Sequence, residues 1–453
     1  MENQTEIKKG TLMTEGSIPK QIILFALPLL LGNIFQQLYN TADSIIVGNI
    51  IGSNALAAVS SSFSLIMMIT SLLMGITLGA SVVIANYYGA GELTQMKDAI
   101  HTAIAFGMVA SVVISIVGLL FSPTILKWMG TPSNLMESSV LYLRIIFLGM
   151  FGNMMYNVGS SIFRAVGDSK RPLYYLIFCS ILNIGLDLLF VAVFRMGIAG
   201  AALATIIAQL VSAGITFRTL IKEKTEYQID LKEIRFHPKE LRLIINIGLP
   251  SGIQNAIVSF SNVVVQANIN AFGAMAMAGC GSYNKIDGFA VMPAMSFSMA
   301  LTTFIGQNLG ANKPDRMKKG ARFGIIASMV TVEIGGILIY AFAPFLVRLF
   351  QSNPQVIEYG VEMARTIAPF YFLLALSHSM AGTMRGAGLS NVPMLVMVIC
   401  WCGMRVTWIT AAVHFIKDIH IVFLGYPLTW LASAIIFLIY YKKKDWVHHS
   451  IVG

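Results

Sequence analysis

The sequence predicts an all-α polytopic membrane protein with twelve transmembrane helices in two related halves of six. Three observations predict this fold class: a low content of charged residues, repeated long apolar segments, and an internal repeat. Of the 453 residues, 56% are hydrophobic and only 11% are charged, whereas soluble domains have about 25% charged residues. The apolar segments are continuous for about 20 residues or more, which is typical of membrane-spanning helices and not of β-barrel strands.

The apolar segments and the charges between them define the topology. The predicted helices cover residues 18–48, 55–88, 97–121, 139–165, 172–194, 198–221, 241–271, 280–309, 318–344, 355–385, 392–415 and 419–441. Of the 31 Lys and Arg residues, 23 lie at the termini or in the even-numbered loops, and only four lie in the odd-numbered loops. Because positively charged loops stay in the cytoplasm, both termini are predicted to be cytoplasmic. The net charge of +10 therefore needs no nucleic-acid partner.

A long polar loop divides the chain. The predicted organisation is an N-terminal tail (1–17), a first lobe (18–221), a cytoplasmic linker (222–240), a second lobe (241–441) and a C-terminal tail (442–453). An offset of 221 or 222 residues places Pro28 on Pro250 and Asn33 on Asn255, and it places "FRAVGDSKRP" on "TMRGAGLSNVP". Because each lobe has an even number of helices, the repeat is parallel, and two such lobes around a shared site are typical of a secondary transporter.

The first predicted helix carries a polar face inside its apolar sequence. The face consists of Asn33, Gln36, Gln37, Asn40, Asp43 and Ser44, which fall within an arc of about 120° on a helix. The seventh helix repeats this pattern with Asn255, Ser259, Asn262 and Gln266. Because unpaired polar groups are costly in lipid, these faces are predicted to line a substrate cleft. Hydrogen bonding between neighbouring helices is the alternative.

Two intramembrane carboxyl groups indicate an ion site. Asp43 has no counterpart in the second half, where the offset places Val265. In the fifth helix, Asn183 and Asp187 share one face, and Asp187 and Thr205 each lie about 12 Å below the outer surface. With Asp43 and the nearby Asn40, these residues are predicted to bind a coupling ion. Carboxylate, amide and hydroxyl oxygens suit either a shared proton or Na⁺, and no other cofactor is expected.

Four motifs resemble the multidrug and toxic compound extrusion (MATE) transporters. They are "LPLLLGNIFQQLYNTADSIIVG", "GASVVIANYYGAGE", "FRAVGDSKRP" and "NIGLDLLF". The resemblance covers nearly the whole chain and implies a V-shaped pair of six-helix lobes in a prokaryotic cell membrane. It also implies export of amphipathic, mainly cationic small molecules in exchange for H⁺ or Na⁺, with one chain sufficient for function.

The resemblance assigns roles to individual residues. The family's first-lobe cation site falls on Asp43, Asn183, Asp187 and Thr205, and the proline at which its first helix bends falls on Pro28. Some family members carry a functional Glu on the seventh helix. Here the seventh helix has no acid, and Trp408 takes the place of Asp187 in the repeat. This departure argues against a cation site in the second lobe.

Other charged residues lie within the predicted helices. Lys285 either lines the cleft or pairs with an acid on another helix, and Asp287 points to a different face. Glu333 has either Arg405 or Lys285 as a possible partner. Arg405 is expected to stack on Trp401 and Trp408, and Glu362 and Arg365 are expected to form a local ion pair.

Other classes of protein fit the sequence less well. A related flippase for lipid-linked or amphipathic metabolites would usually have more helices and a basic cleft, and it remains the alternative. An enzyme would need a catalytic constellation of His or Cys nucleophiles, which the sequence lacks. A channel is disfavoured by the duplicated lobes.

Overall fold

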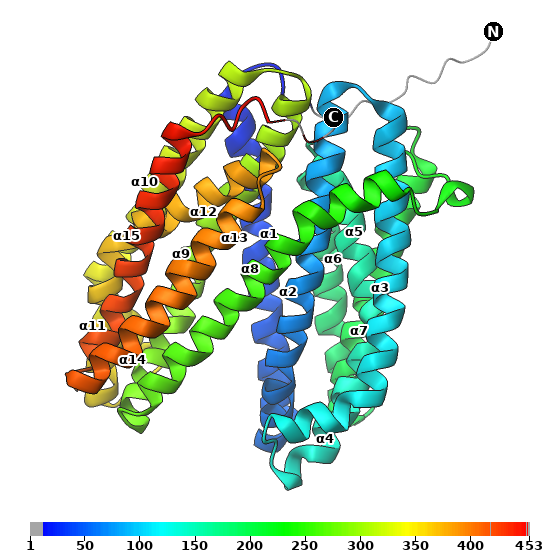
Figure 1. Cartoon of the computed structure of the whole chain (residues 1–453). Coiled ribbons are helices and arrows are strands. Elements are labelled where there is room, and N and C mark those ends of the chain that lie inside the picture. Colours follow the sequence, from blue (N-terminus) through cyan, green and yellow to red (C-terminus); the bar gives the residue numbers. More distant parts are fainter. Residues whose placement is uncertain (1–11, 417, 450, 452–453) are drawn as a thin grey trace. The chain divides into compact units, whose positions relative to one another are not determined.

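The computed structural model describes residues 12–416, 418–449 and 451 (Figure 1). Some side chains between residues 53 and 68 are outside this description. Of the predicted terminal tails, residues 1–11, 450 and 452–453 also lie outside the described residues.

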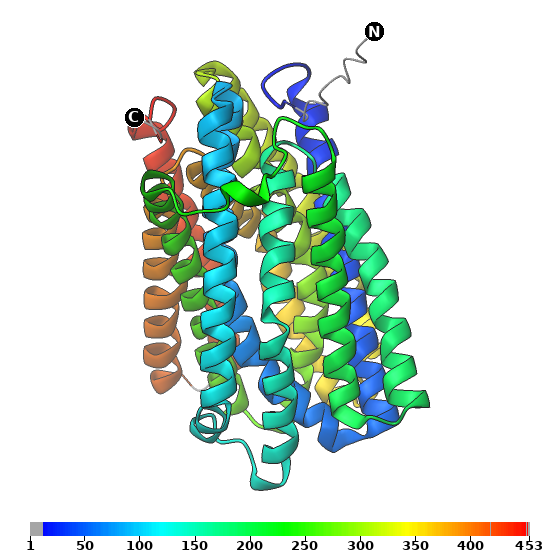
Figure 2. The same ribbon diagram turned by 90° about the vertical axis from the view of Figure 1, so that its right-hand side faces the viewer.

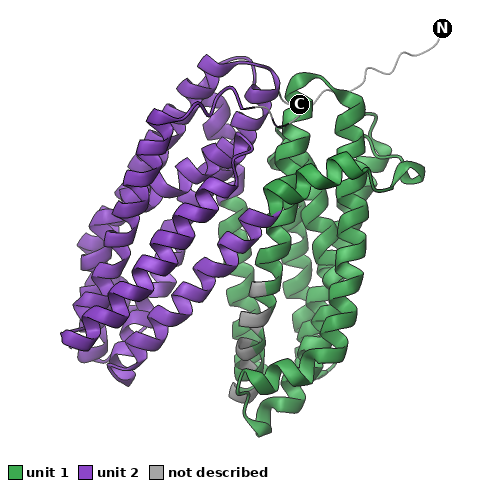
Figure 3. Ribbon diagram, in the orientation of Figure 1, with its two compact units in different colours: residues 1–12, 31–248 green, residues 13–30, 249–453 purple. Residues whose placement is uncertain are grey.

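The described chain divides into two compact units (Figure 3). Unit 1 contains residues 31–248, and unit 2 contains residues 13–30 and 249–453. Two long helices, α1 (Ile18–Ile46) and α8 (Pro238–Asn270), each belong to both units. In each helix the change of unit falls within a few residues of the repeat-related prolines, Pro28 and Pro250.

Both units are built from helices. After α1, the elements up to the linker are the π-helical η1 (Val47–Ile51), α2 (Ser53–Ala90), α3 (Leu93–Trp128), α4 (Ser133–Leu148), α5 (Met150–Ala165), α6 (Lys170–Asp187), the π-helical η2 (Leu188–Val193), α7 (Gly197–Lys222) and the 3-10 helix η3 (Leu231–Glu233). After α8 they are α9 (Ala274–Gly310), α10 (Pro314–Arg348), α11 (Pro354–Ile367), the 3-10 helix η4 (Ala368–Phe370), α12 (Tyr371–Gly386), α13 (Asn391–Met397), the π-helical η5 (Val398–Met404), α14 (Arg405–Phe415) and α15 (Ile419–Lys443).

These elements form the twelve predicted membrane spans. Eleven helical segments of the described chain are long and apolar enough to cross a membrane, and the bent pair α4–α5 forms the twelfth. The predicted fold class is confirmed, although six of the spans extend three or more residues beyond a predicted end. The fourth and tenth spans are interrupted: α4 and α5 meet at Gly149 with a 44° bend, and η4 separates α11 from α12.

The internal repeat is visible in the backbone. Gly52 and Gly273 connect the first two spans of each half and have φ angles of 118° and 101°. Gly167 and Gly388, also one repeat apart, have φ angles of 84° and 78°. Residues with a Cβ rarely adopt such angles, so both halves need glycine at the same places.

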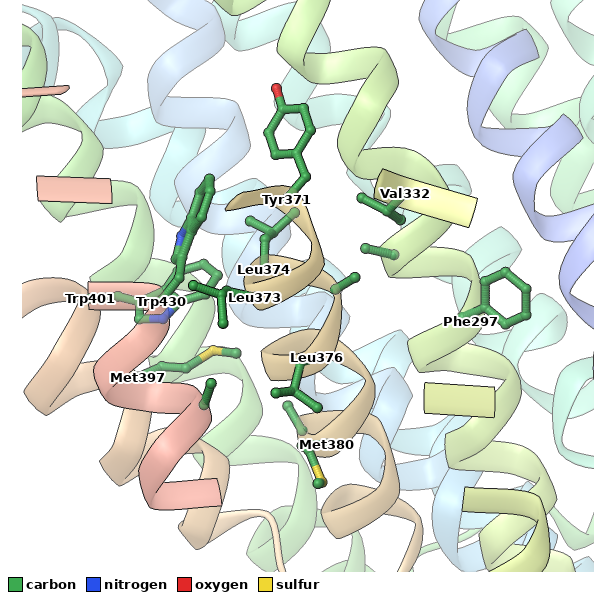
Figure 4. Close-up of a cluster of buried hydrophobic side chains, with 14 of the residues drawn as sticks. Phe297, Val332, Tyr371, Leu373, Leu374, Leu376, Met380, Met397, Trp401 and Trp430 are labelled. Carbon is green, nitrogen blue, oxygen red and sulfur yellow. The ribbon is translucent and has the colours of Figure 1, made fainter. Parts of the chain in front are cut away.

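Each unit has its own core. In unit 2, buried side chains of α9, α10, α12 and α15 form a continuous apolar cluster, part of which is shown in Figure 4.

In unit 1, α8 crosses α2 so closely that a Cβ on Gly79 would lie 2.6 Å from the main-chain nitrogen of Gly248. This contact places the first turns of α8 in unit 1.

The linker between the halves is bound to unit 1 (Figure 2). The main-chain N–H of Asp230 donates to Nε2 of His101 (3.2 Å), and that of His237 donates to the hydroxyl of Thr102 (3.1 Å). Both acceptors lie on α3, so the linker is an ordered part of this unit.

Candidate ion-binding site

The two acids predicted to bind a coupling ion lie next to π-helical turns. Asp187 is the last residue of α6 and directly precedes η2, and Asp43 lies one turn before η1. A π-helical turn interrupts the regular i to i−4 hydrogen bonding and often marks a functional site. η5 likewise directly precedes a charged residue, Arg405. Thus each π-helical segment in the described chain lies beside an intramembrane charge.

The carboxyl groups of Asp43 and Asp187 meet. Their side chains are hydrogen-bonded to each other, and Asp187 is completely buried. Ionised carboxylates are acceptors only, so a hydrogen bond between two carboxyl groups requires a proton on one of them. Oδ1 of each residue is also buried and accepts no hydrogen bond from the described residues. The pair is therefore suited to hold at least one proton.

Asn183 connects this pair to α7. In one orientation of its carboxamide, both the nitrogen and the oxygen are hydrogen-bonded. Nδ2 then donates to Oδ2 of Asp187 (3.1 Å), and Oδ1 accepts from the main-chain N–H of Thr205 (3.3 Å). The Thr205 hydroxyl donates to the carbonyl of Ala201 (3.1 Å). The structure thus brings together four of the predicted residues, with Thr205 held through its main chain.

Asn40, which was also predicted to bind the coupling ion, is not hydrogen-bonded through its side chain to the acid pair in the described part of the chain. It is half-buried on α1, and its main-chain carbonyl accepts from the hydroxyl of Ser44 (2.9 Å). Within the described part of the chain, no hydrogen bond joins its carboxamide to Asp43 or Asp187. Its assignment to the ion site stays a prediction.

Two tyrosines of the site were not predicted. Tyr39 and Tyr142 are close enough to Asp43 and Asp187 for both acid charges to act on their hydroxyl groups. Tyr39 lies one turn before Asp43 on α1, beside the predicted polar face, so the helical spacing could have identified it. Tyr142 comes from α4, and nothing in its surrounding sequence distinguishes it from an apolar core residue.

The predicted cleft residues lie on exposed or half-buried faces. In unit 1, Gln36 and Gln37 are exposed and Asn33 is half-buried. In unit 2, Asn255 and Asn262 on α8 are exposed. The exposed amides of Gln36, Gln37 and Asn255 can contact a polar ligand within their own unit, and the shared cleft stays a prediction. Pro28 is accommodated inside α1, and its role as a bend also stays a prediction.

Comparison with known proteins decides the family. The family model MatE matches residues 28–189 and 250–408, which is more than half of the chain. The chain belongs to the MatE family.

Relatives of this MatE chain are described as multidrug transporters. The chain is 31% identical over 445 residues to the "Probable multidrug resistance protein YoeA" of Bacillus subtilis, covering 95% of this chain and 96% of that protein. It is 29% identical to the "Probable multidrug resistance protein NorM" of Thermotoga maritima, covering 84% and 83% of the two chains. A solved structure of a multidrug resistance MATE family transporter in an outward-facing conformation matches with a TM-score of 0.90 and 24% identity, covering 97% of this chain and 100% of that one. The MatE chain is therefore a multi-pass efflux transporter and not an enzyme.

In unit 2 of this MatE chain, the partners of the intramembrane charges differ from those considered from the sequence. Glu333 is bound neither to Arg405 nor to Lys285: its Oε2 accepts from the main-chain N–H of Phe372 (2.9 Å) at the start of α12. The interruption of the tenth span, which hydropathy does not reveal, creates this free donor. The exposed Lys285 has its Nζ 5.4 Å from the ring centroid of Phe350, so its predicted role in the cleft stays open.

The expected local ion pair of Glu362 and Arg365 is wrong. Glu362 and Arg365 do not pair: Glu362 lies 3.8 Å from His420, and the Arg365 guanidinium lies 5.8 Å from the ring centroid of Tyr340. α15 and α10 flank α11 and offer these partners, which the local i, i+3 spacing cannot indicate.

The expected stacking of Arg405 is confirmed for one of its two aromatic partners. Its guanidinium lies 5.5 Å from the ring centroid of Trp401 and 4.6 Å from that of Tyr426. Trp408 instead donates its indole N–H to the carbonyl of Ile421 (3.0 Å). Arg405 therefore stacks on α15 as well as on its own span.

Proposed function

We propose that this MatE transporter is a secondary antiporter of the cell membrane that exports amphipathic, mainly cationic small molecules in exchange for protons. The hydrogen bond between the Asp43 and Asp187 side chains is the observation that carries this proposal. It joins two helices, α1 and α6, through a proton that can be exchanged. Binding or release of that proton changes the charge of a buried pair, and the two helices must repack in response.

The donor set favours a proton over Na⁺. Hard cations such as Ca²⁺ and Mg²⁺ take about six oxygen ligands, and we expect a Na⁺ site to need several oxygens too. At this site Asn183 presents its amide nitrogen, and not its oxygen, to Oδ2 of Asp187. The two carboxyl groups remain as ligands, together with the Thr205 hydroxyl oxygen, which keeps its lone pairs while it donates to its own helix. Na⁺ is the alternative coupling ion, and the experiment below distinguishes the two.

The membrane potential supplies part of the driving force. One proton entering across about 100 mV releases roughly 2.3 kcal/mol. For a neutral substrate this corresponds to a concentration ratio of about 50-fold, since each 1.4 kcal/mol is tenfold. For a monovalent cation exchanged one for one, the electrical contribution cancels and only the proton gradient drives export. We place both termini and the linker in the cytoplasm, as the distribution of Lys and Arg indicates.

Dye efflux from proteoliposomes tests the proposal. The full chain is reconstituted and loaded with ethidium, a monovalent amphipathic cation, and a pH gradient or a Na⁺ gradient is imposed separately. We expect efflux with the pH gradient alone, and loss of this efflux in Asp43→Asn and Asp187→Asn. Asp315→Asn, the same change at an exposed position of α10, should keep parental efflux. Efflux with the Na⁺ gradient alone would replace the proton by Na⁺, and unchanged efflux in both site variants would reject the site.

A second substrate class deserves a direct test. A "FAD transporter" of Shewanella oneidensis is 25% identical to this chain over 356 residues and covers 77% of each. An amphipathic phosphorylated metabolite is therefore the alternative cargo, as a flippase-like function would require. Counterflow of FAD under the same pH gradient, without transport of ethidium, would favour this alternative.

A further inference from the structure

The linker between the two halves exposes two large apolar side chains. Leu231, the first residue of η3, is 59% exposed, and Phe236, which lies shortly before α8, is 44% exposed. The exposed basic residues Lys232 and Arg235 lie between them in the sequence. Single exposed apolar residues are common on protein surfaces, so the level of the linker relative to the membrane decides what these two side chains contact.

The linker is bound beside α3 at the level where the charged part of this helix ends. Its main chain donates to His101 and Thr102, and His101 lies about 12 Å along the helix axis from the first residue of α3. From Thr102 to Leu126 the sequence contains no charged residue. Figures 1 and 2 both show the linker beside α3, below the turn between α2 and α3. Because charged residues stay outside the hydrocarbon core, a membrane surface is expected at this level.

Basic side chains are exposed along the whole linker. Between residues 222 and 242 all six Lys and Arg residues are exposed, and none of them forms an ion pair with an acid of the described chain. Clusters of basic residues next to a membrane span are typical of surfaces that bind anionic lipids. The six residues are Lys222, Lys224, Lys232, Arg235, Lys239 and Arg242.

The acids of the same segment are mostly engaged with other groups of unit 1. Glu223 forms an ion pair with Arg171 (2.8 Å). Glu240 is 4% exposed and accepts from the hydroxyl of Tyr87 (3.0 Å). Asp230 accepts from a main-chain N–H of η3 (2.9 Å) and caps this short helix. The unpaired charge at the surface of the linker is therefore mainly positive.

A hollow of about 550 Å³ lies between α3 and the linker. It is lined by Lys97 of α3, Ile221 of α7 and residues 228–233, which include Lys232. Glu233 also lines the hollow, but its carboxylate lies 3.9 Å from Nδ1 of the buried His101. Two ammonium groups beside one hollow suit the phosphate of a phospholipid headgroup, since Lys is a compact cation that binds phosphate as a point charge.

We propose that residues 228–239 form an interfacial anchor that binds anionic phospholipids. Leu231 and Phe236 insert between the acyl chains at the membrane surface, and Lys97, Lys232 and Arg235 contact the phosphate groups. Apolar side chains next to basic ones are the combination with which peripheral segments bind an anionic membrane. Because the anchor leads directly into α8, it holds the first turns of this helix at the membrane surface. Lipid binding can be measured without transport, so the proposal does not depend on the proposed function.

Spin labels report whether the two apolar positions enter the membrane. The full chain carrying Leu231→Cys or Phe236→Cys is labelled with a nitroxide and placed in nanodiscs of phosphatidylcholine, with or without phosphatidylglycerol. Collision of the label with oxygen, which concentrates in lipid, is compared with collision with a water-soluble nickel complex. The parent labelled in parallel gives the background, because Cys402 is only half-buried. Asp315→Cys, at an exposed position of α10, is the control in water.

The two labels in the linker should favour oxygen when phosphatidylglycerol is present, whereas the label at position 315 should favour nickel. Without phosphatidylglycerol, the linker labels should become more accessible to nickel, because the basic residues lose their partners. If the linker labels are as accessible to nickel as the label at position 315, the proposal is wrong. Equal depth in both lipid compositions would overturn the binding of anionic lipid.

Native mass spectrometry of the full chain tests the basic residues. The ratio of bound phosphatidylglycerol to bound phosphatidylcholine should fall by about tenfold in the double variant Lys232→Gln and Arg235→Gln. The matched control is Lys318→Gln with Lys319→Gln, which removes the same charge. These two exposed lysines of α10 lie at the repeat positions of Lys97 and its neighbour. The control should keep the parental ratio, and an equal fall in both double variants would reject the linker as the binding surface.

Discussion

The interruptions of the fourth and tenth spans lie at equivalent places of the repeat, but different groups stabilise them. In unit 1 the Ser115 hydroxyl of α3 donates to the carbonyl of Phe147 (2.6 Å). In unit 2 the equivalent residues are Gly336 and Ala368, and a Cβ on Gly336 would lie 2.6 Å from the carbonyl oxygen of Ala368. Direct contact of two main chains thus replaces the hydroxyl.

This difference shows what the duplication preserves. Both halves keep an interrupted span, whereas the side chains that satisfy its main-chain groups have changed. In unit 2 a carboxylate, Glu333, accepts from the freed N–H of Phe372, and the adjacent Tyr371 is bound to Asp287. The joint in unit 2 therefore depends on two acids, whereas the joint in unit 1 uses a neutral hydroxyl.

The two units also differ at the repeat-related positions of the acids predicted to bind the coupling ion. Val265 occupies the position of Asp43 and is 1% exposed, and Trp408 occupies the position of Asp187. The two positions in unit 2 thus carry no carboxyl group: one holds a buried valine and the other an exposed tryptophan. The predictions below test these differences, from the largest expected effect to the smallest.

The largest effect should come from the acid pair. We expect Asp187→Asn to abolish proton-driven ethidium efflux, because an amide cannot take up or release the proton shared with Asp43. The repeat-related change Trp408→Phe should leave coupling intact, since Trp408 has no group that binds or releases a proton and its indole N–H donates to the main chain of Ile421. Equal loss of efflux in both variants would mean that the two units contribute alike, contrary to the comparison.

Gly336 and its neighbour provide a matched pair for the joint in unit 2. A Cβ at Gly336 meets the main chain of Ala368, whereas one at Gly335 meets nothing within 4 Å. We expect Gly336→Ala to destabilise the protein by about 1–3 kcal/mol through overpacking, and Gly335→Ala to be neutral or to stabilise by about 0.5–1 kcal/mol. Thermal unfolding of the purified variants in one detergent measures both. Similar unfolding temperatures of the two variants would show that the close approach of Gly336 to Ala368 does not determine stability.

Glu333 should contribute more to stability than Ser115, the residue that stabilises the interruption in unit 1. We expect Glu333→Ala to cost about 1–3 kcal/mol, because the main-chain N–H of the half-buried Phe372 loses its acceptor, and Ser115→Ala to cost about 0.5–1.5 kcal/mol. Glu333→Gln keeps an acceptor oxygen and should restore most of the loss. If Glu333→Gln is as unstable as Glu333→Ala, the hydrogen bond to Phe372 is not what the acid contributes.

The smallest effect should come from the N-terminus of α11. Asn353 accepts from the main-chain N–H of Gln355 (3.0 Å) as an N-cap, whereas its repeat equivalent, Pro132, provides no side-chain cap to α4. We expect Asn353→Ala to lower stability by about 1 kcal/mol. Ser352→Ala, at the exposed neighbouring position, serves as the control, and a change of the same size there would assign the effect to the loop.

Hydropathy and charge were sufficient to predict all twelve spans, because membrane crossing imposes a minimum length and excludes charge. The helical spacing and the estimated depth in the membrane also predicted that Asp43, Asn183 and Asp187 belong together. The interruptions could not be predicted, since they depend on how a hydroxyl of α3 or an acid of α10 meets a main chain far away in sequence. For the same reason, Asp287 could be placed on a face different from that of Lys285, but its tyrosine partners could not be identified.

The sharing of α1 and α8 between the units bears on how this polypeptide can be divided. A cut in the linker would separate Met13–Leu30 from the 249–453 segment it packs with, and it would remove the turns of α8 that approach Gly79. Neither fragment would carry all the segments of its own bundle. We therefore expect two coexpressed fragments to recover the native assembly only if each fragment supplies its helical end to the bundle of the other. The sharing of the two helices thus prevents either half from folding completely by itself.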